Sequence, residues 1–324
     1  MNPLLTRRQF LLVATAMAGA GLVRAEDFPS RNLRLVVPVG AGSGGDTLMR
    51  VIAEPLAAQL KQPVVVDNRP GGDGLIAMQA LLSSPADGYT LLLIGPQPMV
   101  FNPLLRSDLP YKVTDLRPVV GVARGWSALA TGANSKFASF EELAAAARKQ
   151  RNAVTMGTSG LSYRVGATLL GHKLGVQFTH VPYKTVPQML TDLIGGVLDV
   201  ALVDAGPTVA QVRGGKLRVL AAASRERLAQ LPEVPTMRER GTDFDQALWT
   251  AIAVRAGTPE PVLRTLEAGL QKALASSEVR ALVAKLGTLE ISGSSGETVA
   301  AEIAADTARF RDIVKEIAPD VGGG

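Results

Sequence analysis

The chain has 324 residues, with 34 lysines and arginines against 29 aspartates and glutamates, two histidines and no cysteine. The lack of cysteine excludes disulfides, thiol nucleophiles and thiolate metal sites, and the spacing of His172 and His180 fits no common metal motif. Such a chain has little equipment for nucleophilic or metal-assisted catalysis. We therefore expect no enzymatic activity, no metal and no cofactor, and we interpret both histidines as structural.

The first 25 residues predict an export signal. Twin arginines, Arg7 and Arg8, precede an apolar run from Leu11 to Leu22, and small residues lead to a cleavage site after Ala25. This pattern is typical of bacterial twin-arginine signals, and the run is shorter than the about 20 residues that span a bilayer. We expect a periplasmic protein. Three arginines leave with the signal, which lowers the net charge from +5 to +2 and gives no reason to expect nucleic acid as a partner.

The first half of the mature chain alternates apolar, β-branched runs with helical patterns. The predicted strands are 33–39, 63–67, 89–94, 116–123 and 127–131, the predicted helices are 46–60 and 75–83, and 95–103 is a proline-broken loop. This alternation predicts an α/β fold with a mainly parallel sheet and helices on both faces.

The second half repeats the first in kind. The predicted strands are 153–156, 178–181, 198–203, 217–223, 248–254 and 288–292, and the predicted helices are 139–148, 163–174, 187–194, 209–213, 259–276, 278–286 and 295–317. Two chain crossings, near Trp126 and Trp249, predict two lobes, with residues 26–124 and 249–324 in lobe 1 and 125–248 in lobe 2. Ligands of open α/β sheets bind outside the carboxyl ends of the strands, so we expect a ligand between the lobes.

A glycine-rich turn, 40–45, links the first predicted strand to the first predicted helix. This geometry points free backbone N–H groups at an anion, so we expect a small negatively charged molecule there. The turn also matches the dinucleotide fingerprint GxGxxG, with Asp67 about 20 residues on as a ribose-binding acid. Asp46, directly after the third glycine, argues against a pyrophosphate because it repels one. From this motif alone, anion binding, dinucleotide binding and a purely structural turn all stay open.

A second polar turn opens the helix predicted at 163–174. Thr158, Ser159 and Ser162 are either helix caps or donors that face the glycine turn. Arg164 is either solvated or forms a bidentate pair with a ligand carboxylate.

Further polar residues follow predicted strands. Tyr183 with Lys184, Asp204 and, more weakly, Gln97 stand after strand ends, where they suit the wall of a cleft or an exposed surface.

Many stretches, in order over the whole mature chain, resemble the periplasmic solute receptors of tripartite tricarboxylate transporters, the Bug-type binding proteins. The matching stretches are 35–38 (LVVP), 42–46 with Arg50, 63–71 (PVVVDNRPG), 86–91 (ADGYTL), 102–103 (NP), 180–184 (HVPYK), 193–196 (LIGG), 214–218 (GGKLR), 231–236 (LPEVPT) and 256–259 (AGTP).

The resemblance implies a two-lobe Venus-flytrap fold of type II-like architecture, each lobe a mixed, mainly parallel sheet flanked by helices. It implies capture of a small carboxylate and delivery to membrane permease subunits, and we expect a monomer. In the family, backbone donors and hydroxyls of the two turns hold the ligand carboxylate, often with water. Carried over to this chain, the ligand-binding set falls on Ser43, Gly44, Gly45, Asp46 and Thr47 in the first turn and on Thr158, Ser159 and Ser162 in the second.

This chain departs from the family pattern in its second turn, which is shorter and has Arg164 where the family usually has His. We hypothesise that Arg164 replaces the lost donors and favours a second negative group on the ligand. Two other functions are alternatives: an exported NAD(P)-dependent oxidoreductase, and a sensory receptor that docks on a histidine kinase.

Overall fold

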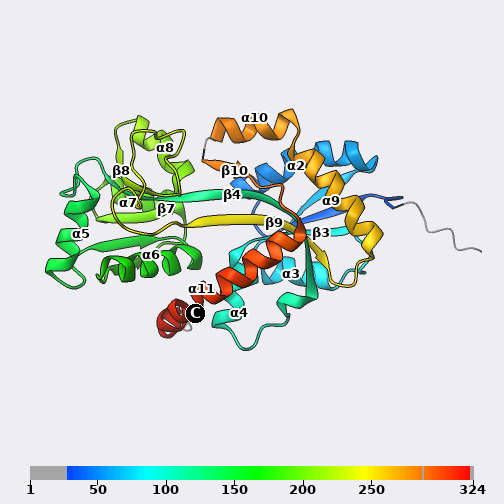
Figure 1. Cartoon of the computed structure of the whole chain (residues 1–324), viewed down its shortest axis with the longest axis horizontal. Coiled ribbons are helices and arrows are strands. Elements are labelled where there is room, and N and C mark those ends of the chain that lie inside the picture. Colours follow the sequence, from blue (N-terminus) through cyan, green and yellow to red (C-terminus); the bar gives the residue numbers. More distant parts are fainter. Residues whose placement is uncertain (1–27, 287, 322–324) are drawn as a thin grey trace, which may run out of the picture.

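A computed structural model describes residues 28–286 and 288–321 of the chain. The predicted export signal lies outside these residues. Figure 1 shows two bodies of unequal make-up joined by two long strands, β4 (Leu116–Gly132) and β9 (Ala247–Arg255), which pair antiparallel from end to end of β9. The two strands form a hinge between the bodies, which we call the first and second lobe.

The first lobe holds the strand order β2-β1-β3-β9-β4, with β10 on the far side of β4. Its own strands are β1 (Leu33–Val37), β2 (Val64–Asn68), β3 (Thr90–Ile94) and β10 (Leu289–Ile291). β1 pairs parallel with β2 and β3, whereas β3 pairs antiparallel with β9. The lobe therefore has a mixed sheet.

Helices cover both faces of this sheet because side chains alternate along each strand. Leu35 and Val37 pack in one buried cluster, and Val36 between them packs in another. The first cluster is shared with α2 (Gly44–Leu60), α9 (Glu260–Leu274) and α10 (Ser277–Leu286), and the second with α3 (Leu75–Leu82), η2 (Gln97–Phe101), α4 (Asn102–Leu105) and α11 (Gly296–Val321). Two short 3₁₀ turns, η1 (Gly72–Gly74) and η3 (Val113–Asp115), complete the lobe.

The second lobe has the order β6-β5-β7-β4, with β8 on the other side of β4. Its own strands are β5 (Thr155–Thr158), β6 (Thr179–Pro182), β7 (Val200–Asp204) and β8 (Leu217–Ala223). Helices α5 (Phe140–Lys149) and α6 (Leu161–Leu174) cover one face, and α7 (Val186–Ile194) and α8 (Ala205–Arg213) cover the other.

The parallel strands of the first lobe end toward the second lobe. Strand β9 enters the first lobe from the hinge, so its early residues lie nearest the second lobe. Ile94, the last residue of β3, pairs with Ala251, whereas Leu92 pairs with the later Ala253. Because β1 and β2 run parallel to β3, all three carboxyl ends face the second lobe.

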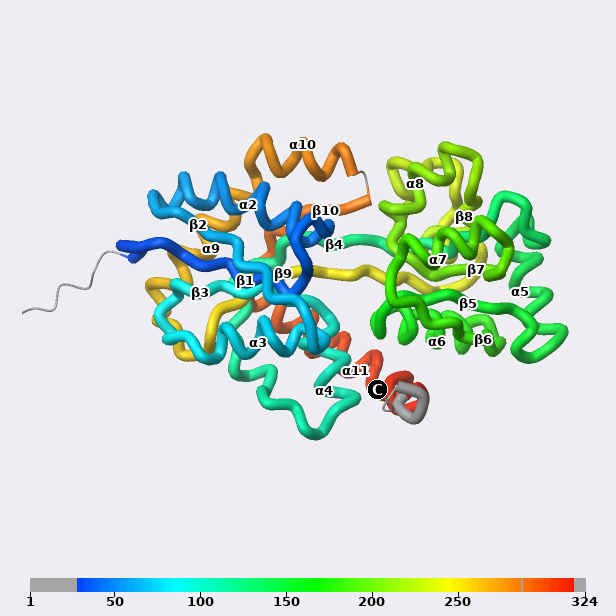
Figure 2. The backbone as a smooth tube through the Cα atoms, turned by 180° about the vertical axis from the view of Figure 1, so that it is seen from behind, coloured from blue at the N-terminus to red at the C-terminus, as the bar shows by residue number. Residues whose placement is uncertain are grey.

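The parallel strands of the second lobe end toward the first lobe. Ser127, where β4 enters the second lobe, pairs with Asp204 at the end of β7, and Ala130 farther in pairs with Ala201. Strands β5 and β6 run parallel to β7. Figure 2 accordingly places the loop before α2 and the start of α6 on the sides of the two lobes that face each other.

Two predictions about the elements are wrong. The pieces predicted at 116–123 and 127–131 form one 17-residue strand, because Arg124, Gly125 and Trp126 between them pair with β9. The proline-broken loop predicted at 95–103 contains η2 and the start of α4. Pro103 lies in the first turn of α4, where a helix does not need the missing N–H group. The predicted lobe boundaries fall inside β4 and β9, the strands that both lobes share.

Candidate functional site

The glycine turn ends in the amino terminus of α2, where Ser43 is the N-cap residue. Its backbone is extended, with φ −71° and ψ 165°, and its Oγ accepts the Asp46 N–H at 3.3 Å. Its carbonyl accepts the Thr47 N–H at 2.9 Å. The N–H groups of Gly44 and Gly45, the first two helical residues, have no acceptor within the helix. These two donors, together with the helix dipole, make this end of α2 suited to an anion.

Asp46 holds the turn from inside, with only 2% of its surface exposed. One carboxylate oxygen accepts the Gly42 N–H at 2.8 Å and Arg50 Nε at 3.0 Å, and the other accepts Asn68 Nδ2 at 2.9 Å. These bonds, Arg50 first, then Gly42 and Asn68, lower the pKa of Asp46 to about 2. Asn68 also donates to the carbonyl of Val39, at 3.0 Å. The Asp46 carboxylate is thus fully engaged within the protein, and Arg50 balances its charge.

The second turn is held by fewer side chains. Thr158, at the end of β5, is buried, and its carbonyl accepts the Tyr183 N–H at 2.9 Å. Gly160 is the N-cap residue of α6, with φ +88° and no side-chain cap, while Ser159 beside it is partly buried. The carbonyl of Ser162 accepts Gln246 Nε2 at 2.8 Å. The first N–H groups of α6 are again without acceptors in their helix, so this end also suits an anion.

Asp204 ends β7 at the same edge and is the N-cap residue of α8 without a side-chain cap bond. Burial raises its pKa, and the neighbouring Tyr163 hydroxyl lowers it in part. Burial, and then the Asp204 charge, raise the pKa of Tyr163 in turn. The structure therefore brings Asp204 to the predicted cleft edge, next to the second turn.

Arg164 lies elsewhere than the hypothesis of a facing donor requires. It lines a pocket of about 150 Å³ between α6, β6 and α11, together with Thr168, His180 and Glu316. His172 lines the same pocket, and its Nε2 lies 2.7 Å from the Glu316 carboxylate.

The remaining predicted residues lie near the strand ends that face the other lobe, but they differ in exposure and in hydrogen bonding. The Tyr183 hydroxyl donates to Asp192 at 2.9 Å, and burial followed by this bond raises its pKa to about 12. Gln97 begins η2, three residues after the last residue of β3, and is partly buried. Thr47 and Lys184 are exposed.

Sequence reasoning missed Asn68 and Gln246 as supports of the two turns. The i,i+4 spacing of Asp46 and Arg50 predicts their ion pair. Asn68 and Gln246 reach the turns only through tertiary structure, from the end of β2 and from the chain before β9.

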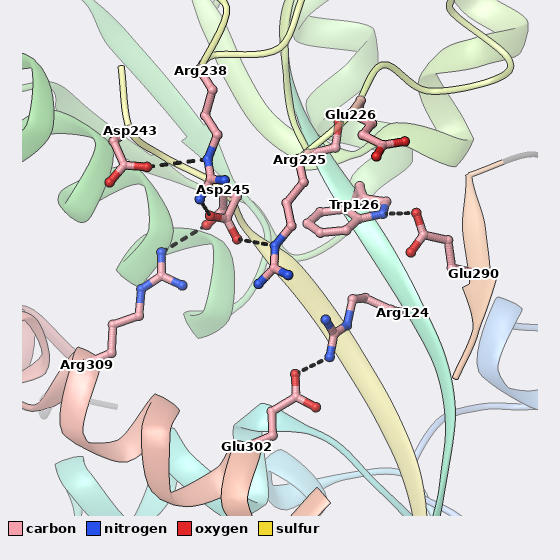
Figure 3. Close-up of polar contacts among 11 residues, drawn as sticks. Arg124, Trp126, Arg225, Glu226, Arg238, Asp243, Asp245, Glu290, Glu302 and Arg309 are labelled. Atoms are coloured by element: carbon pink, nitrogen blue, oxygen red, sulfur yellow. Dashed lines mark hydrogen bonds and ion pairs between the residues drawn. The ribbon is translucent and has the colours of Figure 1, made fainter. Parts of the chain in front are cut away.

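Helix α11 of the first lobe lies along the hinge and contacts the second lobe (Figure 3). Arg309 donates to the carbonyl of Asp245 at 3.0 Å, and Arg124 on β4 lies 2.5 Å from Glu302. Asp245 also pairs with Arg238, at 2.6 Å. Arg309 thus ties α11 to the chain that leads from the second lobe into β9, and Glu302 ties it to β4.

Each hinge strand contributes one tryptophan side chain that donates a hydrogen bond to a carboxylate. Trp126 Nε1 donates to Glu290 at 2.7 Å, as Figure 3 shows, and Trp249 Nε1 donates to Asp306 at 2.8 Å. Any movement of the lobes must therefore preserve or break these hydrogen bonds and ion pairs between the hinge strands, β10 and α11.

Within residues 28–286 and 288–321, no three or more His, Asp or Glu side chains are grouped so that they could hold a metal ion. No helix in the same residues has both the length and the apolar composition needed to cross a bilayer.

The sequence pattern of the tripartite tricarboxylate transporter family receptors, TctC, matches residues 48–318. The chain is 33% identical over 296 residues to a UPF0065 protein of Bordetella bronchiseptica, a match that covers 90% of this chain and 88% of the relative. It is 32% identical over 311 residues to protein BugT of Bordetella pertussis, covering 94% and 95%. The chain belongs to the family of tripartite tricarboxylate transporter receptors.

Solved structures agree with this family. Rpa4515 of R. palustris with adipate has a TM-score of 0.78 at 29% identity and covers 89% of this chain and 98% of its own. MatC of Rhodopseudomonas palustris with bound malate has a TM-score of 0.75 at 26% identity and covers 89% and 100%. The predicted Bug-type receptor and its two-lobe fold are confirmed, and the family decides against the oxidoreductase that the glycine motif alone left open.

Proposed function

We propose that this chain captures a small organic carboxylate between its lobes and delivers it to the membrane subunits of a tripartite transporter. The observation that carries the proposal is the pair of helix amino termini, of α2 and α6, at strand ends that face each other across the hinge. Such termini favour anions through free N–H groups and the helix dipole. Relatives whose structures contain adipate and malate support a carboxylate as the ligand.

The carboxylate docks first on the Gly44 and Gly45 N–H groups, because the Asp46 network already holds that turn in shape. The second lobe then closes about β4 and β9, with the lobes divided at 124/125 and 248/249, and brings Thr158, Ser159 and Ser162 onto the ligand. The ligand favours the closed state only through its extra contacts with the second lobe. No covalent bond changes, and the closed form is what the permease recognises.

The mature receptor works as a monomer in the periplasm, after export and removal of residues 1–25. The export signal predicted in residues 1–25 and the family of solute receptors support the periplasmic location. The ligand-binding residues comprise the two turns, with Gln97, Tyr183 and Asp204 around them, and Arg164 is not among them because it lines the pocket beside α11.

Calorimetry and small-angle scattering test the proposal together. Mono-, di- and tricarboxylates are titrated into the mature protein, and the tightest binder is added for scattering. We expect binding and a smaller radius of gyration, while the corresponding uncharged amides neither bind nor compact the protein. If an acid binds without compaction, the closure step is wrong, and if no acid binds, carboxylate capture is wrong.

A further inference from the structure

Four polar side chains gather on one face of the second-lobe sheet, at the edge that faces the first lobe: those of Ser127, Tyr163, Asp204 and Gln246. Ser127 on β4 and Asp204 on β7 are paired residues, and the Ser127 N–H donates to the carbonyl of Gln246 at 3.1 Å. Leu129 and Leu202, each two residues away along β4 and β7, pack in the cluster shared with α6. Because strand side chains alternate, Ser127 and Asp204 point to the same face, under the first turn of α6.

This cluster has polar atoms that the protein does not satisfy. The Ser127 and Tyr163 hydroxyls and Gln246 Oε1 are buried in residues that are 0%, 6% and 5% exposed, and no hydrogen-bond partner reaches these atoms among the described residues. The Tyr163 hydroxyl lies close enough to Asp204 to affect its pKa, but the pair does not reach hydrogen-bond geometry. Buried polar groups in proteins nearly always have partners, so these atoms indicate a bound polar group.

The negative charge of Asp204 restricts which polar group of a ligand can bind beside it. Within residues 28–286 and 288–321, no basic side chain forms an ion pair with Asp204, whereas Arg50 lies 3.0 Å from the Asp46 carboxylate and neutralises it. A second carboxylate placed here would be repelled, whereas a hydroxyl or ammonium group would donate to Asp204 and to Gln246 Oε1.

We propose that Asp204, backed by Tyr163, Ser127 and Gln246, is the specificity-determining residue of this receptor and binds a hydrogen-bond donor on the ligand. The preferred ligands are then carboxylates that carry a hydroxyl or amino group, rather than unsubstituted dicarboxylates. The inference rests on the proposed function, because the carboxylate itself docks on the two helix termini.

The test compares acids of equal length by calorimetry. Succinate, malate and aspartate form one series, and glutarate, 2-hydroxyglutarate and glutamate form the other, so the hydroxyl and ammonium arms are separate. We expect the wild type to prefer at least one substituted acid over its parent by about tenfold or more, because a site with unpaired polar groups discriminates against ligands that leave them unpaired.

Two variants and a matched control locate the preference. Asp204→Asn should weaken binding of the substituted acid and leave or strengthen binding of the parent, since the like charge is gone. Tyr163→Phe, which removes a hydroxyl and no charge, should reduce the preference several-fold. Asp199 lies just before the first residue of β7, where Lys136 and Thr155 hold its carboxylate. Asp199→Asn is therefore the control, and it should keep the full preference for the substituted acid.

If Asp204 has only a structural role, Asp204→Asn should weaken the binding of substituted and unsubstituted acids alike. That result would overturn the inference. A wild type without preference, or a preference that survives in Asp204→Asn, would overturn it as well. If the wild type binds none of the acids, the proposed function fails first, which the titrations show before any variant is made.

Discussion

The two turns at the lobe edges are alike in position but differ in what holds them. In the first turn, the Asp46 carboxylate binds the Gly42 N–H and Asn68, and Arg50 neutralises its charge. In the second turn, one amide, that of Gln246, holds the Ser162 carbonyl. Beneath it, buried hydroxyls have no partner among the residues the structure describes. The first turn is thus formed before a ligand arrives, whereas the second has polar groups left over for one.

This difference suggests a division of labour between the lobes. A turn whose polar groups are already bonded loses little entropy on binding, so it serves as a general carboxylate platform. A turn with unsatisfied groups gains most from the ligand that satisfies them, so it decides which carboxylate stays. Variants that remove a donor from one turn or a support from the other separate these two roles.

The largest effect should come from Gly44→Pro, which deletes one anion donor of the first turn. Proline suits the first helical position, Ser43 before it is already extended, and a Cβ at Gly44 meets no atom within 4 Å. The helix should therefore survive. Loss of a hydrogen bond to a charged ligand, about 1.5–3 kcal/mol, should weaken binding by roughly 10- to 100-fold in calorimetry.

Gly44→Ala is the control for this prediction, since it adds a Cβ in the same open space and keeps the N–H group. Its affinity and melting temperature should match the wild type. Equal affinities of Gly44→Pro and Gly44→Ala would show that this N–H does not touch the ligand.

A smaller effect is expected at the second turn, where Gln246 is the one side chain that holds the Ser162 carbonyl among the described residues. A Cβ at Gly166 would lie 2.1 Å from Gln246 Oε1, so Gly166→Ala must displace the amide that holds Ser162. Overpacking of this kind costs about 1–3 kcal/mol and should lower the melting temperature. The double variant Gly166→Ala with Gln246→Ala relieves the clash, so its cost should be less than the sum of the single costs. Strict additivity would mean that the clash is absorbed elsewhere.

The sequence predicted the platform better than the discriminating turn, for a physical reason. The strand, glycine turn and helix of the first lobe are local in the chain, and so is the Asp46–Arg50 pair. The inward direction of the Asp46 carboxylate depends on Asn68, 22 residues away, which reaches it only once β2 lies beside β1.

The second turn depends on contacts that no local pattern contains. Gln246 comes from the chain before β9, 84 residues after Ser162. Arg164 was predicted to face the glycine turn, but a helix turns about 100° per residue, and Tyr163 already points at Asp204. The next residue, Arg164, therefore points to the pocket beside α11.

A more modest effect is expected from Asp46→Asn, which removes the charge that holds the first turn. The amide cannot accept from Gly42, Arg50 and Asn68 together, so the turn should loosen and binding weaken by roughly an order of magnitude. Because Asp46 has a folded pKa of about 2, below its ordinary 3.8, its stabilisation is complete above the ordinary value and is lost as the pH falls through about 2. The variant's deficit in melting temperature should therefore be constant from pH 8 to 5 and shrink toward pH 2.

Asp67→Asn is the matched control for Asp46→Asn. Asp67 lies in β2 next to Asn68 and pairs with Arg34 at 3.1 Å and Arg69 at 3.0 Å, both half-exposed and neither part of the turn. Its loss should leave the affinity unchanged. Similar losses of affinity in both variants would assign the effect to general charge at this edge rather than to the turn.

The smallest effect extends the comparison from the turns to the hinge. Asp306 accepts the Trp249 N–H, but burial raises its pKa, the reverse of the shift at Asp46. A raised folded pKa means that its favourable contribution is present below the unfolded pKa of about 3.9 and is lost as the pH rises through the folded value. Asp306→Asn keeps an acceptor for Trp249 and removes the buried charge, so at pH 7.5 the melting temperature should rise by about 1–2 °C. The gain should shrink as the pH falls through the raised folded pKa of Asp306. A variant that is less stable than the wild type at pH 7.5 would mean that Arg124 and Arg309 already neutralise Asp306 as fully as Arg50 neutralises Asp46.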